Sequence, residues 1–279
     1  MTVMTQYDLH THSTASDGSL SPTQLVERAQ QQGVTHLALT DHDGTEGIEE
    51  AQKVAAMEGI KLIPGVEISV SWHGATVHIV GLNLDINNAE LQQGLADLRD
   101  YRKTRAETIA LKLEKAGYPG ALEGAGQYAS KTMLGRVHFA RFLLEQGYAK
   151  DMKDVFKRFL VRNKPGYVSG EWTSLQQAVS WINAAGGQAV VAHPARYKMT
   201  ATKRRKLLRE FKQLGGAGIE VSSGKQHPEE VRTMANLAQE FELLASCGSD
   251  FHSPDNAWTE LGSMTTMPPF VTPIWNQWQ

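Results

Sequence analysis

Short apolar runs rich in β-branched residues alternate with amphipathic stretches along most of the chain. The apolar runs predict strands at residues 7–10, 36–40, 62–70, 77–82, 189–192, 218–221 and 243–245. The amphipathic stretches predict helices at residues 21–32, 47–58, 174–185, 203–214 and 228–240. This alternation is typical of β/α units, in which each strand is followed by a helix that packs on the sheet.

Residues 88–164 break the alternation, because no convincing strand pattern falls within them. Helical patterns cover residues 89–115, 133–146 and 151–160 instead, and glycine and proline residues punctuate the edges of the region. We therefore predict a β/α domain whose first part is residues 6–88, an all-helical insertion at residues 89–164, and a second part of the β/α domain at residues 165–279. The tail after Leu261 is rich in proline and tryptophan, and we expect it to be irregular and to pack against the domain.

Composition narrows the functional classes. The 279 residues carry a formal net charge of −2, so no bulk positive field attracts nucleic acid, and polyanion binding must depend on local clusters or metal ions. The single cysteine, Cys247, excludes an internal disulfide and a thiolate-rich metal site. The sequence shows neither a signal-peptide pattern nor an apolar run of the ~20 residues that span a bilayer, so we expect a cytoplasmic protein.

The first predicted strand leads into two histidines, His10 and His12. Side chains two positions apart in an extended chain point to the same side, so these imidazoles converge and could hold one divalent cation. Asp17 follows in a turn sequence, where an ordinary turn aspartate is the simpler interpretation. The pair alone is weak evidence for a metal site.

Ionisable residues also mark most of the later strands. They follow or lie on five predicted strands, as His42, Glu67, His78, His193, and Asp250 with His252. A hydrogen-bonded core histidine is the simpler interpretation of His78, but a glutamate buried at position 67 needs a cation or an arginine partner. Asp41 and Asp43 are better suited to orient ligands through hydrogen bonds, and we expect structural or exposed roles for His36 and His73.

The separate simple interpretations would have to hold independently at five or more strands. In a parallel β/α barrel the C-terminal ends of the strands meet at one face, so all these side chains would converge. Nine nitrogen and oxygen ligands suffice for two or three divalent metals and leave positions for water and substrate. We therefore predict a metal cluster formed by His10, His12, Asp17, His42, Glu67, His78, His193, Asp250 and His252.

In their order along the chain, these motifs resemble those of the polymerase and histidinol phosphatase (PHP) family of phosphoesterases. The matching segments are residues 10–12, 40–42, 65–67, 192–194 and 248–252, together with Asp17 and His78. The resemblance implies an α/β fold, a distorted seven-stranded β/α barrel of the PHP type that carries the all-helical insertion. It also implies three divalent metal ions at the C-terminal face, manganese first, with iron or zinc as alternatives.

The resemblance distributes the ligands among three metals. The first would be held by His10, His12, Glu67 and Asp250. Glu67 would bridge to the second, which His78 and His193 complete. The third would be held by Asp17, His42 and His252. No catalytic residue beyond the metal centre is implied.

Within the family, the insertion resembles that of the group containing nucleoside 3′,5′-bisphosphate phosphatases and 5′-to-3′ exoribonucleases, a likeness supported by residues 134–138 and 193–196. The resemblance implies a hydrolase that removes the 3′-phosphate of nucleoside 3′,5′-bisphosphates and releases 5′-nucleotides from 5′-monophosphorylated RNA. Nucleotides and short or 5′-monophosphorylated RNA are the expected partners, with no membrane and no obligate protein partner.

Arginine is the side chain that matches phosphate bidentately, and Arg136 and Arg196 are the candidate phosphate contacts. For Arg136 a surface helical arginine is the alternative interpretation. Lys225 and His227, which follow the sixth predicted strand, are candidates for a contact with a second phosphate.

Three alternatives stay open at this point. The substrate of the same chemistry could be another small phosphomonoester, such as histidinol phosphate. A non-catalytic binding module could keep the fold, but such modules normally lose ligands and none is missing here. An amidohydrolase usually needs a carboxylated lysine, and no lysine lies at the end of a predicted strand.

Overall fold

The computed structural model describes residues 5–129 and 133–278. Seven strands follow one another around a barrel in the order β1-β2-β3-β4-β6-β7-β8, and the short strand β5 pairs with β3. β1 and β8 meet where the Leu9 amide donates a 3.0 Å hydrogen bond to the Cys247 carbonyl. The predicted distorted seven-stranded barrel with a helical insertion is confirmed. The strands are β1 Tyr7–Asp8, β2 His36–Leu39, β3 Lys61–Trp72, β4 Ala75–Leu82, β5 Thr173–Ser174, β6 Gln188–Val191, β7 Gly218–Ser223 and β8 Leu244–Gly248.

One strand runs against the others. β1, β2 and β3 are mutually parallel, as are β6, β7 and β8, whereas β4 is antiparallel to both β3 and β6. The expectation that every strand ends at the same face is therefore wrong for β4. The physical reason is the connection. β3 turns into β4 through His73 and Gly74, whose positive φ angles of 42° and 75° suit a two-residue hairpin, and a hairpin can join only antiparallel strands.

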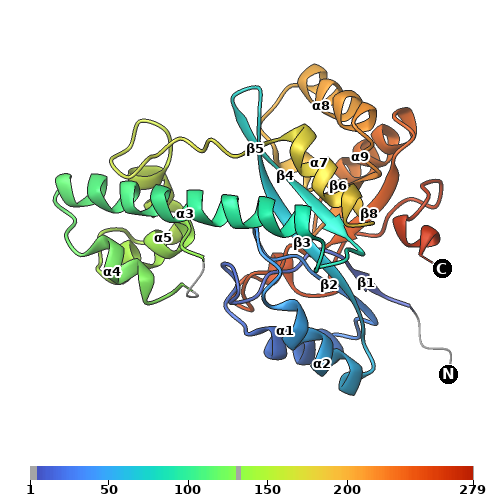
Figure 1. The fold of residues 1–279 in the computed structure, drawn as a ribbon, viewed down its shortest axis with the longest axis horizontal. Helices are drawn as coiled ribbons and strands as arrows, with labels where there is room; N and C mark the ends of the chain where they lie inside the picture. Colours follow the sequence, from blue (N-terminus) through green and yellow to red (C-terminus); the bar gives the residue numbers. More distant parts are fainter. Residues whose placement is uncertain (1–4, 130–132, 279) are drawn as a thin grey trace.

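Helices cover the barrel on two sides, as Figure 1 shows. α1 (Pro22–Gln31) and α2 (Ile48–Glu58) pack together below the first strands in that view, and α7 (Leu175–Ala184), α8 (Ala201–Gln213) and α9 (Pro228–Glu240) lie above. The helices pack on the strands through two apolar clusters, one that contains residues of α1 and α2 and one that contains residues of α7, α8 and α9.

Local sequence signals set the helix ends. The Ser21 hydroxyl accepts a hydrogen bond from the Gln24 amide at 3.2 Å, and the Gln24 side chain accepts one from the Ser21 amide at 3.0 Å. This reciprocal pair satisfies two amides that a helix start leaves free, and Pro22 occupies the first helical position. Gly59 ends α2 in the left-handed conformation, with φ of 70°.

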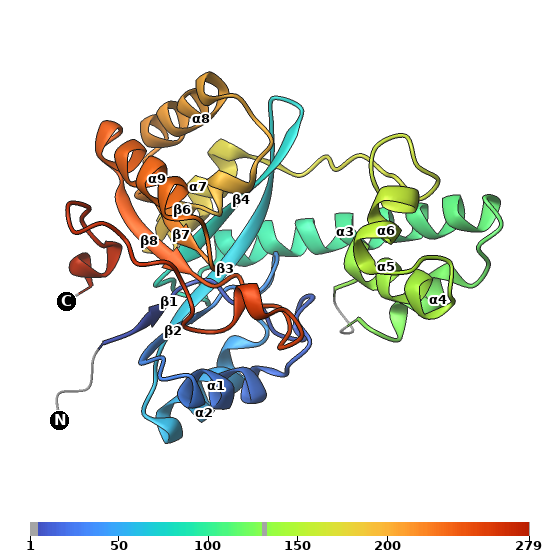
Figure 2. The same ribbon diagram turned by 180° about the vertical axis from the view of Figure 1, so that it is seen from behind.

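The insertion forms a helical cluster with its own apolar core. Figures 1 and 2 show the long helix α3 (Ala89–Lys115) running from the barrel to this cluster, where it packs with α4 (Ala121–Gly126) and α5 (Arg136–Glu145). α6 (Met152–Val155) continues as a π-helical turn over Phe156–Leu160. The glycine-rich α4 and the two-residue strand β5 were not predicted. The division into residues 6–88, 89–164 and 165–279 stays a prediction.

The C-terminal tail packs on the end of the barrel where β1 begins and β4 finishes. Ile274, in the 3-10 turn Ile274–Gln277, is fully buried among barrel residues that include Leu9 and Val190. Trp275 stacks on Tyr7 with ring centroids 4.0 Å apart. The tail thus packs on the barrel, as the sequence predicts. Within the described part of the chain, no helix combines the length and apolarity that crossing a bilayer requires.

Candidate metal centre

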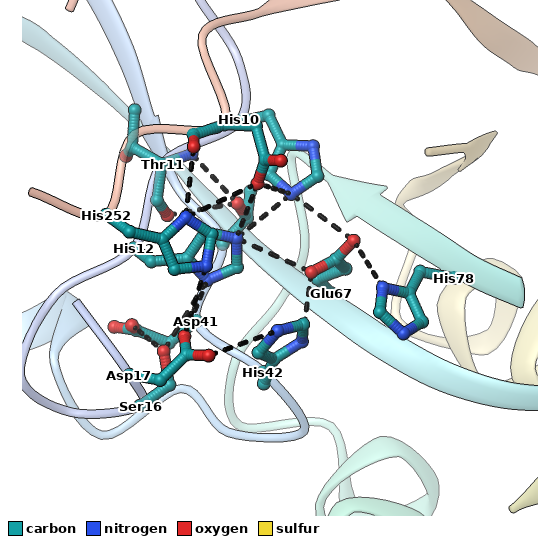
Figure 3. A network of polar contacts seen from close by, with 12 residues as sticks. His10, Thr11, His12, Ser16, Asp17, Asp41, His42, Glu67, His78 and His252 are labelled. Atoms are coloured by element: carbon teal, nitrogen blue, oxygen red, sulfur yellow. Dashed lines mark hydrogen bonds and ion pairs between the residues drawn. The ribbon is translucent and has the colours of Figure 1, made fainter. Parts of the chain in front are cut away.

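The nine predicted ligands come from six strands or the loops that follow them, and the structure brings them into one cluster. Figure 3 shows seven of them, His10, His12, Asp17, His42, Glu67, His78 and His252, in mutual contact. The other two reach the same cluster, because His193 lies 3.0 Å from Glu67 and Asp250 lies 3.4 Å from His12. His36 and His73 lie outside it, one beside Tyr7 and one exposed.

Glu67 occupies the centre of the cluster and is 1% exposed. Its Oε1 lies 3.0 Å from His78 Nδ1, 3.0 Å from His193 Nε2 and 3.4 Å from His10 Nε2. Its Oε2 lies 2.9 Å from His42 Nδ1 and 3.4 Å from His12 Nε2. A carboxylate with imidazoles on both oxygens has the arrangement of a ligand that bridges two cations.

The reversed direction of β4 explains how His78 reaches this place. His78 lies in the first half of β4, opposite Ser69 of β3. Because β4 is antiparallel, its first half lies at the barrel end where its neighbours finish. β3 is longer than β2 and extends beyond the end of it. Glu67, in the middle of β3, therefore lies beside His42 in the loop that follows β2.

A second group of ligands gathers around Asp17. His252 Nε2 lies 3.3 Å from Asp17 Oδ1, and His42 Nε2 lies 3.8 Å from Asp17 Oδ2. His12 Nδ1 lies 3.9 Å from Asp17 Oδ1. His12 therefore touches both this group and the group of His10 and Glu67. The groups of His10, His12 and Glu67, of His12, Asp17, His42 and His252, and of His42, Glu67 and His78 could each hold a metal ion.

The donors fit divalent cations better than they fit one another. His10 Nε2 and His12 Nε2 lie 3.1 Å apart. If both nitrogens are unprotonated, their lone pairs repel one another, and a proton or a cation between them removes this repulsion. His42 Nδ1 lies 2.9 Å from Glu67 Oε2 and Asp17 Oδ1 lies 3.3 Å from His252 Nε2, but neither buried atom makes a hydrogen bond of normal geometry. Buried polar atoms normally have well-oriented hydrogen-bond partners, and clustered nitrogen and carboxylate donors that lack them are the ligand set of a divalent metal.

Without metal, the carboxylates and imidazoles compensate one another. Burial, with His252, lowers the pKa of His12 to about 3. Burial also opposes the charge of His252, but Asp17 raises its pKa to about 10. Burial likewise acts against the charge of Glu67, yet the surrounding imidazoles hold its pKa well below the usual value. Cations that bind here would displace protons from such imidazoles.

Two acidic residues support the cluster from behind. Glu220 Oε1 lies 2.5 Å from His10 Nδ1, and Glu220 Oε2 accepts a 2.5 Å hydrogen bond from the His193 amide. Asp41 accepts hydrogen bonds from Ser13 and Ser16 beside the loop of Asp17. The supporting role that we expected for Asp41 matches these contacts. Sequence reasoning missed Glu220, although a glutamate inside an apolar strand pattern was available as a signal.

Two of the predicted ligands have strained backbones. His193 has φ of 31° and Asp250 has φ of 57°, in a region that side chains other than glycine seldom adopt. Such conformations persist where surrounding contacts hold them, and they are concentrated at functional sites. Here they turn both side chains from the strand ends toward Glu67 and His12.

A pocket of about 190 Å³ adjoins the cluster between the barrel and the insertion. Asp17, His42 and His78 line it on the cluster side, and Arg102, Arg105 and Arg136 line it on the insertion side. Arg102 pairs with Asp43 and donates to the Ser69 hydroxyl at 2.8 Å. Arg136 is thus brought to the site, and the sequence reasoning had not singled out Arg102 and Arg105.

The other two arginines of this pocket have no acidic partner among the described residues. Arg105 is 7% exposed, and its Nε makes no hydrogen bond. Burial and the charges of Arg136 and Arg102 lower the pKa of Arg105 to about 10. Arg105 is buried and Arg136 is exposed at the edge of the same pocket, so their like charges repel one another unless an anion lies between them, and the pocket has the electrostatics of a phosphate site.

The remaining candidates lie on another side of the cluster. Arg196 pairs with the Asp250 carboxylate rather than facing Arg136. Together with Lys225 and His227 it lines a separate pocket. The structure therefore does not join Arg136 and Arg196 into one clamp.

Comparison with known proteins agrees with this geometry. The family model described as PHP domain matches residues 8–223, a span that contains seven of the nine cluster residues. The chain belongs to the PHP family. This PHP protein is 45% identical over 275 residues to the 3′,5′-nucleoside bisphosphate phosphatase of Chromobacterium violaceum, covering 98% of the chain and 96% of the relative. It is 46% identical to the 5′-3′ exoribonuclease Rnm of Escherichia coli, covering 98% of the chain and 94% of the relative.

Two solved structures share the fold. An amidohydrolase from Chromobacterium violaceum, solved with bound sulfate and no metal, superposes with a TM-score of 0.93 at 45% identity, over 98% of this chain and 95% of that one. A Bifidobacterium adolescentis protein assigned as a metal-dependent phosphoesterase superposes with a TM-score of 0.81 at 25% identity, over 97% and 93%.

Proposed function

We propose that this PHP protein hydrolyses phosphate esters at a centre of three divalent metal ions, with manganese as the first choice and iron or zinc as alternatives. Its substrates are nucleoside 3′,5′-bisphosphates, from which it removes the 3′-phosphate, and 5′-monophosphorylated RNA, from which it releases 5′-nucleotides. One observation carries this proposal, a cluster of nine candidate ligands beside a pocket lined by two arginines, the buried Arg105 and the exposed Arg136, that no described carboxylate neutralises.

The ligand distances support the distribution among metals. His10, His12, Glu67 and Asp250 would hold one cation, and Glu67 would bridge to a second near His78 and His193, with which Oε1 makes its two 3.0 Å contacts. Asp17, His42 and His252 would hold the third. His12 and His42 each belong to two of the geometric groups, so either could be shared.

The metals would neutralise the phosphate oxygens and lower the pKa of attacking water. The chain supplies position and charge. Arg105 and Arg136 would bind a terminal 5′-phosphate, and Arg102, which Asp43 and Ser69 hold in place, would orient it. The water oxygen would form the new bond to phosphorus, the bond between phosphorus and the 3′-oxygen would break, and that oxygen would take up a proton.

One geometry serves both substrates. A 5′-phosphate in the arginine pocket places the 3′-phosphate of the same nucleotide over the cluster. In a bisphosphate that group leaves as inorganic phosphate. In RNA it is the first phosphodiester, so cleavage releases a 5′-nucleotide and leaves a new 5′-phosphate on the shortened chain.

The test is to compare RNA that carries a 5′-phosphate with the same RNA carrying a 5′-hydroxyl, and adenosine 3′,5′-bisphosphate with adenosine 3′-monophosphate. We expect kcat/KM to be at least about tenfold higher for each 5′-phosphorylated substrate, since a charge-assisted contact contributes about 1.5–3 kcal/mol. Equal rates on both members of each pair would rule out the terminal-phosphate pocket.

Histidinol phosphate or another small phosphomonoester is the alternative substrate. It has no second phosphate for the arginine pocket, so turnover at the rate of adenosine 3′,5′-bisphosphate would favour it. We further propose that the protein acts in the cytoplasm on nucleotides and RNA.

A further inference from the structure

A second pocket begins where the metal cluster ends, on the side of Asp250. Arg196 connects the two, because its Nη1 binds the Asp250 carboxylate and its Nη2 donates to the Ser223 carbonyl at 3.2 Å. The pocket has a volume of about 390 Å³ and is also lined by Lys225, His227 and Trp258. The arginine pocket beside the insertion is lined by three other residues of the cluster, Asp17, His42 and His78.

Trp258 is the notable side chain of this pocket, since it is 70% exposed. Its backbone is nevertheless held, because the Trp258 carbonyl accepts a 3.0 Å hydrogen bond from the Lys225 amide and the Trp258 amide donates to Asn256 Oδ1 at 3.2 Å. Gly224, with φ of 63°, permits this approach, because a Cβ there would lie 3.0 Å from the Trp258 carbonyl. The backbone that carries this solvent-facing indole is therefore held beside Lys225.

This combination suits single-stranded nucleic acid. Lys225 and His227 offer cationic or hydrogen-bonding groups for a phosphate, whereas Arg196 is already paired with Asp250. Glu230 is the acid that lines the pocket. An exposed indole offers a face on which any base can stack, and such stacking contributes about 1–3 kcal/mol per base. Figure 2 shows the orange-red turn Ala257–Thr259 in front of the barrel strands, on the side from which the insertion projects.

We propose that this pocket binds the nucleotide on the 3′ side of the scissile phosphate, with its base stacked on Trp258 and its own 3′-phosphate near Lys225. The inference rests on the proposed function, which places the first nucleotide between the arginine pocket and the cluster. The second nucleotide is attached to the scissile phosphate through its own 5′-oxygen and keeps that phosphate after cleavage. It must then extend from the cluster on another side, where Asp250 and Arg196 lie. A nucleoside bisphosphate has no such nucleotide, so the pocket distinguishes RNA from the small substrate.

The experiment compares kcat/KM on adenosine 3′,5′-bisphosphate and on the 5′-phosphorylated dinucleotide pApA, in the manganese-loaded protein. For Trp258→Ala we expect the ratio of dinucleotide to bisphosphate kcat/KM to fall about 5- to 100-fold, the loss that one stacked base predicts. Trp258→Tyr keeps a ring and should retain most of the ratio. Phe270→Ala removes another exposed aromatic, 43% exposed and outside this pocket, and should leave the ratio unchanged.

A dinucleotide with an abasic second position isolates the stacking contact. The wild type should lose about the same factor on this substrate as Trp258→Ala loses on pApA, and Trp258→Ala should lose little more. If Trp258→Ala changes turnover of the two intact substrates in the same proportion, or changes neither, the pocket is not the second nucleotide's site while the proposed function stands. If the wild type turns over neither substrate, the proposed function fails instead.

Discussion

Glu220 places a carboxylate oxygen 2.5 Å from Nδ1 of His10, and the contact sets which nitrogen of the histidine faces the cluster. With Nδ1 protonated toward Glu220, the lone pair of His10 Nε2 points at Glu67 and Asp250. The second oxygen of Glu220 holds the amide of the strained His193. One buried carboxylate therefore orients two candidate ligands from different strands.

Glu220→Gln is expected to weaken metal binding about 10- to 100-fold, because partners of this kind behind a metal ligand usually have effects of that size. The amide can still contact His10 but carries no negative charge to hold the Nδ1 proton. Metal content after dialysis against graded chelator measures the change. Glu240→Gln, which removes a carboxylate of an exposed pair with Arg205, is the matched control. Equal metal retention in both variants would contradict the orienting role.

Arg136→Gln tests the phosphate pocket without touching a ligand. We expect kcat/KM on adenosine 3′,5′-bisphosphate to fall about 10- to 100-fold, the range for a lost charge-assisted hydrogen bond. Turnover of adenosine 3′-monophosphate should change much less, since that substrate has no 5′-phosphate. Arg141→Gln, on the same helix but outside the pocket lining, serves as control. A proportional loss on both substrates would mean that Arg136 acts elsewhere than on the 5′-phosphate.

The interior of the insertion contains a pH-sensitive residue. His138 is 1% exposed, its Nδ1 accepts a 2.9 Å hydrogen bond from the Gly135 amide, and burial lowers its pKa from 6.5 to about 4. The folded protein keeps His138 neutral, whereas the unfolded chain protonates it near pH 6.5. Its contribution to stability is therefore present above pH 6.5 and is lost as the pH falls toward 4.

His138→Asn keeps an acceptor for Gly135 but removes this titration. We expect the free energy of unfolding of the wild type, relative to the variant, to decrease by about 2 kcal/mol between pH 7 and pH 5. Urea unfolding of both proteins in chelator measures it, so that metal release does not contribute. A difference that stays constant with pH would contradict the prediction.

Gly248 lets the two ends of the strand path approach each other. A Cβ at this position would lie 2.3 Å from the His10 Cβ and 2.7 Å from the His10 amide nitrogen. Gly248→Ala is expected to lower stability by about 1–3 kcal/mol through overpacking and to reduce metal content, because His10 must move. Gly126→Ala, where a Cβ meets nothing within 4 Å, is the control for thermal unfolding. Equal melting temperatures for the two variants would show that the closure tolerates a methyl group.

The sequence was informative about the cluster because its ligands interrupt apolar strand patterns, where an ionisable residue is costly without a partner. On that ground Glu67 was recognisable as a residue that needs a cation or an arginine partner, whereas His193 was assigned because the pattern recurs at several strands. The direction of β4 could not be predicted in this way, because an apolar run does not show in which direction its strand runs. The two-residue turn at His73 and Gly74 decides the direction. His78 was therefore assigned to the cluster correctly but for a geometric reason that does not hold for its strand.

The arginine pocket was harder to find for a different reason. Arg102 and Arg105 lie on a helix rich in charged residues, where the simplest interpretation is a solvated face. Whether they are buried depends on how α3 crosses the barrel and packs beside Trp172, which both guanidiniums approach. Such tertiary contacts leave no periodic trace in the chain. Glu220, by contrast, carried the same signal as Glu67 and was overlooked.

The hydrogen bond between Leu9 and Cys247 has a consequence for biosynthesis. His10 and His12 are synthesised long before β8, the strand that completes their surroundings. The contacts of these two histidines with β8 therefore cannot form until the intervening helices and strands have been made. Contacts between residues so far apart in sequence form late and slowly. A chain that ends before β8 also lacks Asp250 and His252, so the cluster is complete only when this last strand and the loop after it have been made.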